Sequence, residues 1–489
     1  MSLQIGIDLG TSGVKAVLIE DATEVRAEAG RPIAVSVPHL GWSEQAADLW
    51  VEAAFDCLDR LAQEHPGLMG AVEAIGLSGQ MLACLPLDAD LRPLRPAMLW
   101  NDQRALAECA ELAARVPDIG MRANGAPDPG ITAPKLMWLA RHEPGVMAAA
   151  RMLLLPKDYL RLALTGEVAS EPTDAGGTGL FDCGRGAWAD DLCAAAGWDP
   201  AHLPPVVASW APAGGLRGTL ARRWGMRPGL PVAAGAGDNM ASTLGVGAAL
   251  PGDAVLTVGT SGVACIVDAA FHPGPGRAIL TSAHAAPDTF LSMGVVMSAT
   301  AALDWAGRLT RATAADLAGE AEAWAASGRL ADAPVMLPCL NGIRTPLNRP
   351  DAMARIDGLH PGVTPAMLGY GVMEGVAFQL ADCVAAQVEV GARPQRIALV
   401  GGGARSPLWA RLIATAIGQP VALPPRAHVS GPGGAARLAA VAAGAAVGTL
   451  ARKGEPVAVI DPDAGLAAGL AERRARFRAL LPAPGPGAG

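Results

Sequence analysis

Short apolar runs that end in glycine or in a polar turn recur along the chain and predict buried β-strands. Longer stretches with apolar residues at helical spacing lie between them. The predicted strands are 5–7, 16–19, 74–78, 231–235, 255–256, 265–267 and 397–401, and the predicted helices are 48–62, 364–390 and 407–417. Strands that alternate with helices in this way indicate an α/β fold.

One hairpin pattern occurs twice, about half the chain length apart. The string Gly-Thr-Ser-Gly stands at 10–13 and again at 259–262, and each copy lies between two predicted strands. The repetition predicts two related α/β domains that meet near residue 247. We therefore expect an N-terminal domain at 1–247, a C-terminal domain at 248–481 and a frayed, Pro/Gly-rich tail at 482–489.

The composition narrows the range of partners. Of the 489 residues, 51% are hydrophobic and 17% are charged, which is typical of a globular chain and excludes disorder for most of it. The formal net charge is −8, and no run of Lys or Arg is longer than a pair. Nucleic acids and anionic membranes are therefore not expected as partners.

Three features predict a cytoplasmic location. Residues 1–10 contain no basic stretch followed by a long apolar run, so we expect no secretory signal. The longest uncharged apolar stretch, 438–450, is shorter than the ~20 residues that a bilayer requires and predicts a buried helix. The eight cysteines form no C-x-x-C pair, which argues against a zinc site or a disulfide framework.

The two Gly-Thr-Ser turns are the first candidates for phosphate binding. Neither the P-loop string nor the protein-kinase motifs occur, but the backbone N–H groups and hydroxyls of such turns can hold phosphate oxygens. Asp8 precedes the first turn at the end of a predicted buried strand, where an unpaired carboxylate is costly. We therefore expect a magnesium ion or a hydrogen-bond partner beside Asp8. The alternative is that Asp8 only caps the turn through its own backbone.

Asp238 and Asn239 follow another predicted strand, at the start of a helix. An aspartate in this place can be the N-cap of the helix, or it can be the general base that accepts a hydroxyl proton in phosphoryl transfer. Local spacing leaves both alternatives open. The run Gly-Gly-Gly-Ala-Arg-Ser at 401–406 also joins a strand to a helix, where it either lets a ligand approach the backbone or forms only a tight turn.

Short motifs that run in one order over nearly the whole chain resemble the FGGY family of carbohydrate kinases and, within it, the xylulokinases. Each motif is weak alone, and their joint occurrence carries the resemblance. They are Ile5-Gly6-Ile7-Asp8-Leu9-Gly10-Thr11-Ser12-Gly13-Val14-Lys15, Trp42-Ser43-Glu44-Gln45, Leu99-Trp100-Asn101-Asp102, Thr132-Ala133-Pro134-Lys135-Leu136, Leu155-Pro156-Lys157-Asp158-Tyr159-Leu160, Gly237-Asp238-Asn239, Gly259-Thr260-Ser261-Gly262, Arg344-Thr345-Pro346, Met373-Glu374-Gly375 and Gly401-Gly402-Gly403-Ala404-Arg405-Ser406.

The resemblance implies two duplicated ribonuclease-H-like domains of the actin-like ATPase kind, with an interdomain cleft that binds ATP and closes on the sugar. Asp238 would be the catalytic base, and Asp8 would help to hold Mg-ATP. Phosphate contacts are implied for Thr11, Ser12, Lys15, Gly259 and Thr260, adenosine contacts for Gly402, Gly403 and Ala404, and sugar contacts for Gln80, Met81, Leu82, Trp100, Asn101, Asp102 and Asn239.

The chain departs from the family pattern at the implied sugar pocket. Leu82 stands where the xylulokinase string Gly-Gln-Met-His-Gly has histidine, and Ile343 and Leu347 replace polar residues of the string Glu-Arg-Thr-Pro-His. A substrate hydroxyl that faces leucine loses a hydrogen bond, at a cost of roughly 1 to 3 kcal/mol. This loss favours a substrate less polar at one end than D-xylulose, whereas the other pocket matches favour a xylulokinase.

We therefore expect an ATP- and magnesium-dependent phosphotransferase that acts on a terminal hydroxyl of a ketopentose, with D-xylulose as the first choice. The alternative substrate is a less polar ketose or polyol such as 1-deoxy-D-xylulose. A rival of another class is an actin- or chaperone-like ATPase switch, which shares the duplicated fold but has no use for the sugar segment. A homodimer is compatible with this expectation, and His284 and His142 are expected to have structural roles.

Overall fold

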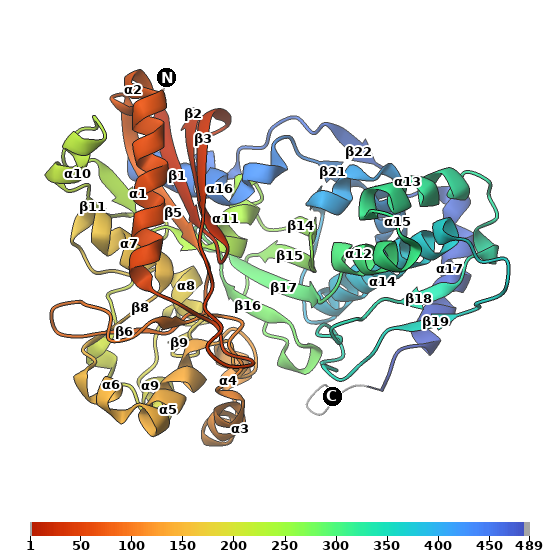
Figure 1. Cartoon of the computed structure of the whole chain (residues 1–489), viewed down its shortest axis with the longest axis horizontal. Coiled ribbons are helices and arrows are strands. Elements are labelled where there is room, and N and C mark those ends of the chain that lie inside the picture. The colour runs from red at the N-terminus through yellow and green to blue at the C-terminus, as the bar shows by residue number, and fades with distance from the viewer. Residues whose placement is uncertain (1, 484–489) are drawn as a thin grey trace.

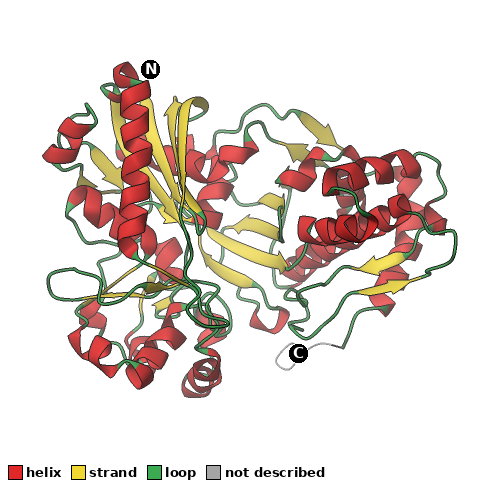
Figure 2. Ribbon diagram, viewed as in Figure 1, coloured by secondary structure: helices red, strands yellow, loops and turns green. Residues whose placement is uncertain are grey.

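The computed structural model describes residues 2–483 and contains two lobes, each built on a mixed sheet of seven strands (Figures 1 and 2). The first sheet contains β1 (Leu3–Leu9), β2 (Gly13–Glu20), β3 (Glu24–Pro32), β5 (Val72–Gly79), β11 (Pro212–Gly215), β12 (Pro231–Ala233) and β13 (Ala236–Gly237). The second contains β14 (Asp253–Val258), β15 (Gly262–Asp268), β16 (Leu280–Ala283), β17 (Phe290–Val296), β20 (Arg396–Val400), β21 (Val421–Leu423) and β22 (Ala458–Ile460). The predicted frayed tail lies outside the described residues from 484 onward.

The two sheets share one topology, as the repeated hairpin predicts. β1 and β2 form an antiparallel hairpin, β5 lies parallel to β1 on its other side, and β12 lies parallel to β5. In the second sheet β14, β15, β20 and β21 hold the same places with the same directions. The strands predicted from the sequence are all present, and the duplicated α/β architecture is confirmed.

The predicted helices are also present, and their ends have local causes. They are α1 (Ala47–Glu64), α14 (Pro365–Glu389) and α15 (Pro407–Ile417). The hydroxyl of Ser406 caps α15 by accepting a hydrogen bond from the N–H of Trp409, and Gly418 ends it in the left-handed region at φ 77°. α14 is buried over most of its length, so it forms the centre of the second lobe's core.

Two helices connect the lobes at the middle of the molecule. α11 (Asp238–Gly245), from the first half of the chain, shares an apolar cluster with β14, β15 and β20 of the second sheet. α16 (Ser430–Ala442), from the second half, packs on β1 and β5 and appears in Figure 1 as a blue helix beside red strands. Each half of the chain thus contributes a helix that packs against the sheet of the other half. The domain boundary near residue 247 stays a prediction from the sequence.

The prediction of one buried helix over 438–450 is wrong in its second half. α16 ends at Ala442, and residues 443–448 are exposed. Gly444 has φ 102°, a backbone conformation that does not continue a helix. The apolar stretch contains only alanine, glycine and other small or aliphatic residues, so hydrophobicity alone did not reveal this turn.

α16 approaches the first sheet so closely that only glycine fits beneath it. A Cβ atom on Gly6 of β1 would lie 1.8 Å from the carbonyl oxygen of Pro432, and one on Gly76 of β5 would lie 1.8 Å from that of Ala435. The same contact brings Gly431 against Asp8, because a Cβ atom on Gly431 would lie 2.8 Å from Oδ2 of Asp8. Backbone packing therefore places the start of α16 at the end of β1.

Within residues 2–483 all eight cysteines are buried free thiols, as predicted for small core residues. In the same range no group of three or more His, Cys, Asp or Glu side chains could hold a metal ion by itself. No described helix combines the length and the apolar character needed to cross a bilayer.

His284 is buried, and it makes the stability depend on pH. Its Nε2 lies 3.0 Å from the carbonyl oxygen of Ala248, to which it donates, and burial lowers its pKa to about 4. The folded state thus holds His284 neutral, while the unfolded chain protonates it below about pH 6.5. The free energy of unfolding should fall by up to about 3 kcal/mol between pH 6.5 and 4 from this residue alone.

The measurement is urea unfolding at several pH values for the wild type and for His284→Gln, which keeps an N–H donor but does not titrate. The wild type should lose more stability than the variant between pH 6.5 and 4. Parallel curves would contradict the assignment.

His142 stacks on Trp138 with ring centroids 4.6 Å apart, which suits the structural role expected for it.

Candidate active site

Asp8 lies at the end of β1, where three elements meet. Its Oδ1 accepts a hydrogen bond from the hydroxyl of Ser78 on β5 at 2.7 Å, and Lys15 stands opposite it on β2. Burial raises the pKa of Asp8, and the hydrogen bond from Ser78 and the charge of Lys15 oppose that rise only in part. Among the described contacts no backbone N–H of the following turn donates to the Asp8 side chain, so Asp8 does not cap that turn.

Asp238 is the first residue of α11, and Gly237 rather than Asp238 is the N-cap. Its Oδ1 accepts hydrogen bonds from the backbone N–H of Asn239 at 2.7 Å and from Nδ2 of Asn239 at 3.0 Å. Burial, followed by the negative charge of Asp8, raises the pKa of Asp238 to about 7. The N-cap alternative therefore does not describe this residue, and a carboxyl that titrates near neutrality suits a general base.

A hydrogen-bond network holds the first turn against the predicted sugar segment. The hydroxyl of Thr11 donates to Oε1 of Gln80 at 3.0 Å and accepts from Nε1 of Trp100 at 2.9 Å. Nε2 of Gln45 donates to the carbonyl oxygen of Thr11 at 2.7 Å, while its Oε1 accepts from Nε2 of Gln80 at 2.9 Å and from Nε1 of Trp50 at 2.9 Å. Gln45 thus joins the first Gly-Thr-Ser turn to the predicted sugar segment, a role that its place in a matched motif did not reveal.

Met81 and Leu82 connect this network to the segment in front of Asp238. Met81 is buried, and a Cβ atom on Gly237 would lie 2.4 Å from its sulfur. Leu82 has φ 69°, and its Cδ2 would lie 2.5 Å from a Cβ atom on Gly177. Met81 therefore lies beside Gly237, the residue before the predicted base Asp238, and Leu82 lies against Gly177.

The carboxylate of Asp102, another predicted sugar contact, is held by neighbouring residues of the protein. It is fully buried, accepts from Nε and Nη2 of Arg104 at 2.9 and 2.6 Å, and accepts from the N–H of Ser43 at 2.7 Å. Arg104 also lies over the ring of Trp42 at 3.5 Å and pairs with Glu44. These contacts tie the segment that carries Trp100, Asn101 and Asp102 to Ser43 and Arg104.

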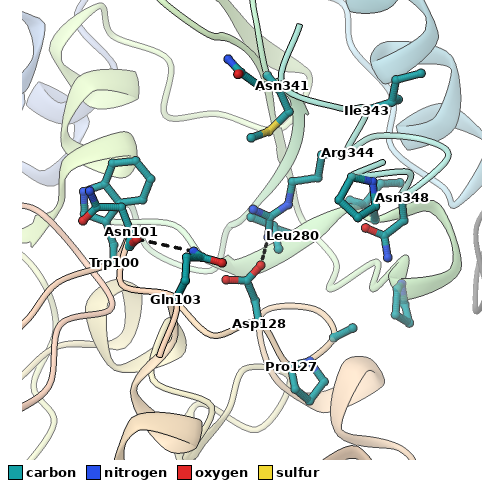
Figure 3. Close-up of a pocket in the computed structure, with 16 residues that line it drawn as sticks. Trp100, Asn101, Gln103, Pro127, Asp128, Leu280, Asn341, Ile343, Arg344 and Asn348 are labelled. Atoms are coloured by element: carbon teal, nitrogen blue, oxygen red, sulfur yellow. Dashed lines mark hydrogen bonds and ion pairs between the residues drawn. The ribbon is translucent and has the colours of Figure 1, made fainter. Parts of the chain in front are cut away.

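A cavity of about 420 Å³ lies between the lobes beside Trp100 and Asn101 (Figure 3). Residues of both lobes line it, among them Gln103, Asp128, Leu280, Asn341, Ile343, Arg344 and Asn348. Arg344 Nη2 reaches toward Asp128 Oδ2 at 3.7 Å and so links the two lobes across the cavity. Of the two positions that depart from the family string, Ile343 lines this cavity, whereas Leu347 packs against the core of the second lobe.

The second Gly-Thr-Ser turn is anchored to α12 (Thr300–Thr310). The carbonyl oxygen of Thr260 accepts from the N–H of Ala299 at 2.9 Å, and that of Gly259 accepts from the N–H of Thr300 at 2.8 Å. Ser12 and Lys15 belong to the first turn and its strand, and Lys15 lies 4.0 Å from Glu28. Ser12 and Thr260 are exposed and Thr11 is half-buried, which leaves both turns open to a ligand.

A second cavity, of about 480 Å³, lies between α12, α13 (Ala314–Ala325) and the glycine run after β20. Gly402 and Gly403 line it, and a Cβ atom on Gly402 would meet nothing within 4 Å. Ala404 does not line it and packs toward the core of the second lobe. Asp304 and Arg405 also line this cavity, and the sequence contained no spacing signal for Asp304.

Two family descriptions match the chain. Residues 3–245 match the FGGY family of carbohydrate kinases, N-terminal domain, and residues 254–443 match its C-terminal domain. The chain belongs to the FGGY family of carbohydrate kinases, enzymes with the actin-like ATPase fold. This membership decides against the alternative of an actin- or chaperone-like switch, and it gives ATP with Mg²⁺ as the phosphoryl donor.

Relatives and solved structures agree with this family. A xylulose kinase of Escherichia coli (strain K12) is 40% identical over 445 residues, which cover 90% of each chain. The crystal structure of a xyloylose kinase from Brucella ovis has a TM-score of 0.93 at 39% identity and covers 98% of this chain and 99% of its own. The xylulose kinase from Rhodospirillum rubrum has a TM-score of 0.89 at 30% identity and covers 97% of both chains.

The carboxylate of Asp8 fits a magnesium ion carried by a nucleotide. Mg²⁺ in phosphoryl-transfer sites usually takes one or two carboxylates and completes its shell with phosphate oxygens and water. Burial raises the pKa of Asp8, and Ser78 and Lys15 offset that rise only in part. A divalent cation beside Asp8 would stabilise its ionised form.

Proposed function

We propose that this protein transfers the γ-phosphoryl group of ATP to the 5-hydroxyl of D-xylulose and forms D-xylulose 5-phosphate. The observation that carries the proposal is the place of Asp238, at the first turn of α11 beside Met81 and within the electrostatic reach of Asp8. The similarity to proteins named xylulose kinases supports the choice of sugar.

In this proposal Asp238 takes the proton of the attacking hydroxyl. The hydroxyl oxygen bonds to the γ-phosphorus as the bond to the ADP oxygen breaks, so one proton leaves the sugar and one phosphoryl group joins it. Bound Mg²⁺ supplies charge neutralisation for the phosphates, and Asp8 would help to hold it. With a pKa of about 7, about half of Asp238 is ionised at neutral pH, and the carboxylate is basic enough to accept the proton.

The remaining predicted residues have positioning roles in the proposal. Backbone N–H groups of the turns around Thr11 and Thr260 would hold phosphate oxygens, with Ser12, Lys15 and Gly259 nearby. Gly402 and Gly403 would lie against adenosine. Gln80, Met81, Trp100, Asn101 and Asn239 would surround the sugar, with Leu82 at one end.

The direct test is product analysis with the purified protein, ATP, Mg²⁺ and D-xylulose. Phosphorus NMR should show a new sugar phosphate monoester that appears together with ADP in equal amounts. Turnover with D-ribulose and with polyols should be slower. Release of inorganic phosphate without a sugar phosphate would contradict the proposal.

Leu82 is proposed to weaken discrimination against a sugar that lacks one hydroxyl. Replacing it with histidine should raise the ratio of kcat/KM for D-xylulose over 1-deoxy-D-xylulose by roughly 5- to 150-fold, because a polar group would again face that hydroxyl. The ratio is measured with both sugars at saturating ATP. A preference for the deoxy sugar in the wild type would instead favour the less polar alternative.

Leu91→His is the matched control, because Leu91 also has a positive φ, of 62°, and lies in a turn that lines neither cavity. This variant should leave the ratio unchanged. An unchanged ratio in Leu82→His as well would mean that Leu82 does not face a substrate hydroxyl.

We also propose that the protein is cytoplasmic and forms a homodimer. The eight buried free thiols support a reducing compartment. Cell fractionation tests the location, and light scattering of the purified protein tests the dimer.

A further inference from the structure

Five charged side chains are buried together beside the segment that leads to Asp238. This buried charged cluster consists of Lys157, Asp158, Arg161, Glu171 and Asp174, whose side chains are all fully buried. Lys157 Nζ lies 2.7 Å from Asp158, 3.2 Å from Glu171 and 3.1 Å from Asp174, and Arg161 lies 3.0 Å from Asp158. None of the five lines either of the two cavities described above.

The charges of the cluster balance when Asp174 is neutral. Burial, together with the negative charges of Asp158 and Glu171, raises the pKa of Asp174 well above its usual range and so favours its neutral form. Two cations then face the two carboxylates of Asp158 and Glu171. A charge-balanced, closely packed cluster of this kind is rigid, because any displacement leaves a buried charge without its partner.

Glu171 fixes the geometry of the next layer. Its carboxylate caps α8 (Pro172–Gly176) by accepting from the N–H groups of Thr173 and Asp174 at 2.8 and 2.9 Å. It also accepts from the hydroxyls of Thr173 at 2.8 Å and Ser209 at 2.7 Å. Since the hydroxyl proton of Thr173 points at Glu171, the oxygen lone pairs of Thr173 are free to face the other way.

Those lone pairs face Gly237. The N–H of Gly237 donates to Oγ1 of Thr173 at 2.9 Å, and Gly237 immediately precedes Asp238. Three residues earlier, Arg161 Nη1 donates to the carbonyl oxygen of Ala234 at 2.9 Å. The short segment 234–237 is therefore held at one end by Arg161 of the buried charged cluster and at the other by Thr173, whose hydroxyl donates to Glu171 of the cluster.

We propose that Thr173 is a positioning residue for Asp238, which it serves by holding Gly237 through its hydroxyl. Gly237 has no side chain of its own to anchor it, and the sulfur of Met81 occupies the place beside its Cα. Loss of the hydroxyl would let Gly237 shift and would turn the carboxylate of Asp238 away from the attacking hydroxyl. The inference rests on the proposed function of Asp238 as the base.

The test compares Thr173→Val with Thr178→Val. Thr178 is a matched control, because it is also buried, accepts from the N–H of Leu180 at 3.1 Å and donates to the carbonyl oxygen of Ala175 at 2.6 Å, but has no hydrogen bond to Gly237. Thr173→Val should lower kcat by about 10- to 100-fold, the scale of a misplaced catalytic group, with KM for ATP within about threefold. Thr178→Val should keep kcat within about threefold, and Thr173→Ser should restore kcat to the same range.

Equal kcat in the two valine variants, or no recovery in Thr173→Ser, would overturn the inference. If Thr173→Val does not fold, Thr173→Ala removes the hydroxyl without added bulk and carries the same expectation. Asp238→Ala, assayed in parallel, separates the role of Asp238 as the base from the role of Thr173 in positioning it. Full turnover in Asp238→Ala removes the base itself, whereas an inactive Asp238→Ala together with a wild-type-like Thr173→Val removes only the role of Thr173.

Discussion

Replacing Asp238 by alanine is expected to lower kcat for sugar phosphorylation by at least ~10²-fold, the usual scale of a general base. The Kd for ATP should stay close to that of the wild type, because the proposed ATP contacts, at the turns around Thr11 and Thr260 and at Gly402, do not include Asp238. The carboxylate that the variant lacks is the one that would take the hydroxyl proton. Steady-state kinetics give kcat, and calorimetric titration gives the Kd.

Asp190→Ala is the matched control for this variant. Asp190 is the first residue of α9 (Asp190–Ala196), the same helical position that Asp238 holds in α11, but it is exposed and lines neither cavity. Its replacement should leave kcat unchanged. Wild-type turnover in Asp238→Ala would remove this residue from the mechanism.

Replacing Gly76 by alanine is expected to destabilise the whole protein. The new Cβ atom would lie 1.8 Å from the carbonyl oxygen of Ala435, and that atom belongs to the backbone of α16. A side chain could turn aside, but the helix must move as a unit away from β1 and β5. We expect a loss at or above the upper end of the 1 to 3 kcal/mol that is typical of overpacked cores, and failure to fold is within the expectation.

Gly67→Ala tests whether the loss of stability in Gly76→Ala comes from the contact between β5 and α16. Gly67 lies in α2 (Pro66–Met69), and a Cβ atom there would meet nothing within 4 Å. Alanine should leave the stability unchanged or raise it by up to about 1 kcal/mol, because glycine is the weaker helix former. Thermal unfolding followed by circular dichroism measures both variants; equal Tm values for Gly76→Ala and the wild type would contradict the packing account.

Local elements were predictable because their signals are local. The two hairpins follow from apolar runs on either side of a Gly-Thr-Ser-Gly turn, and α15 follows from helical spacing between Ser406 and Gly418. The duplication also followed from the sequence, since the second hairpin repeats the first. The turn after Ala442 was missed, because the stretch stays apolar on both sides of it.

The long-range contacts of the site could not be predicted from spacing. The sequence predicts Asp102 as a polar residue of the sugar pocket. In the folded chain its carboxylate accepts hydrogen bonds from Arg104 and Ser43. Conversely, Gln45 carried no assigned role, although it joins Thr11 to Gln80 across distant parts of the sequence. The raised pKa of Asp238 depends on burial and on Asp8, which lies 230 residues earlier in the chain.

The most direct measurement of the central claim is a crystal structure of the protein with D-xylulose and a non-hydrolysable ATP analogue bound with Mg²⁺. The account predicts a carboxylate oxygen of Asp238 within about 3 Å of the 5-hydroxyl, on the side that faces the γ-phosphate. A sugar bound with that hydroxyl away from Asp238, or an Asp238 side chain turned out of the space between the lobes, would contradict it.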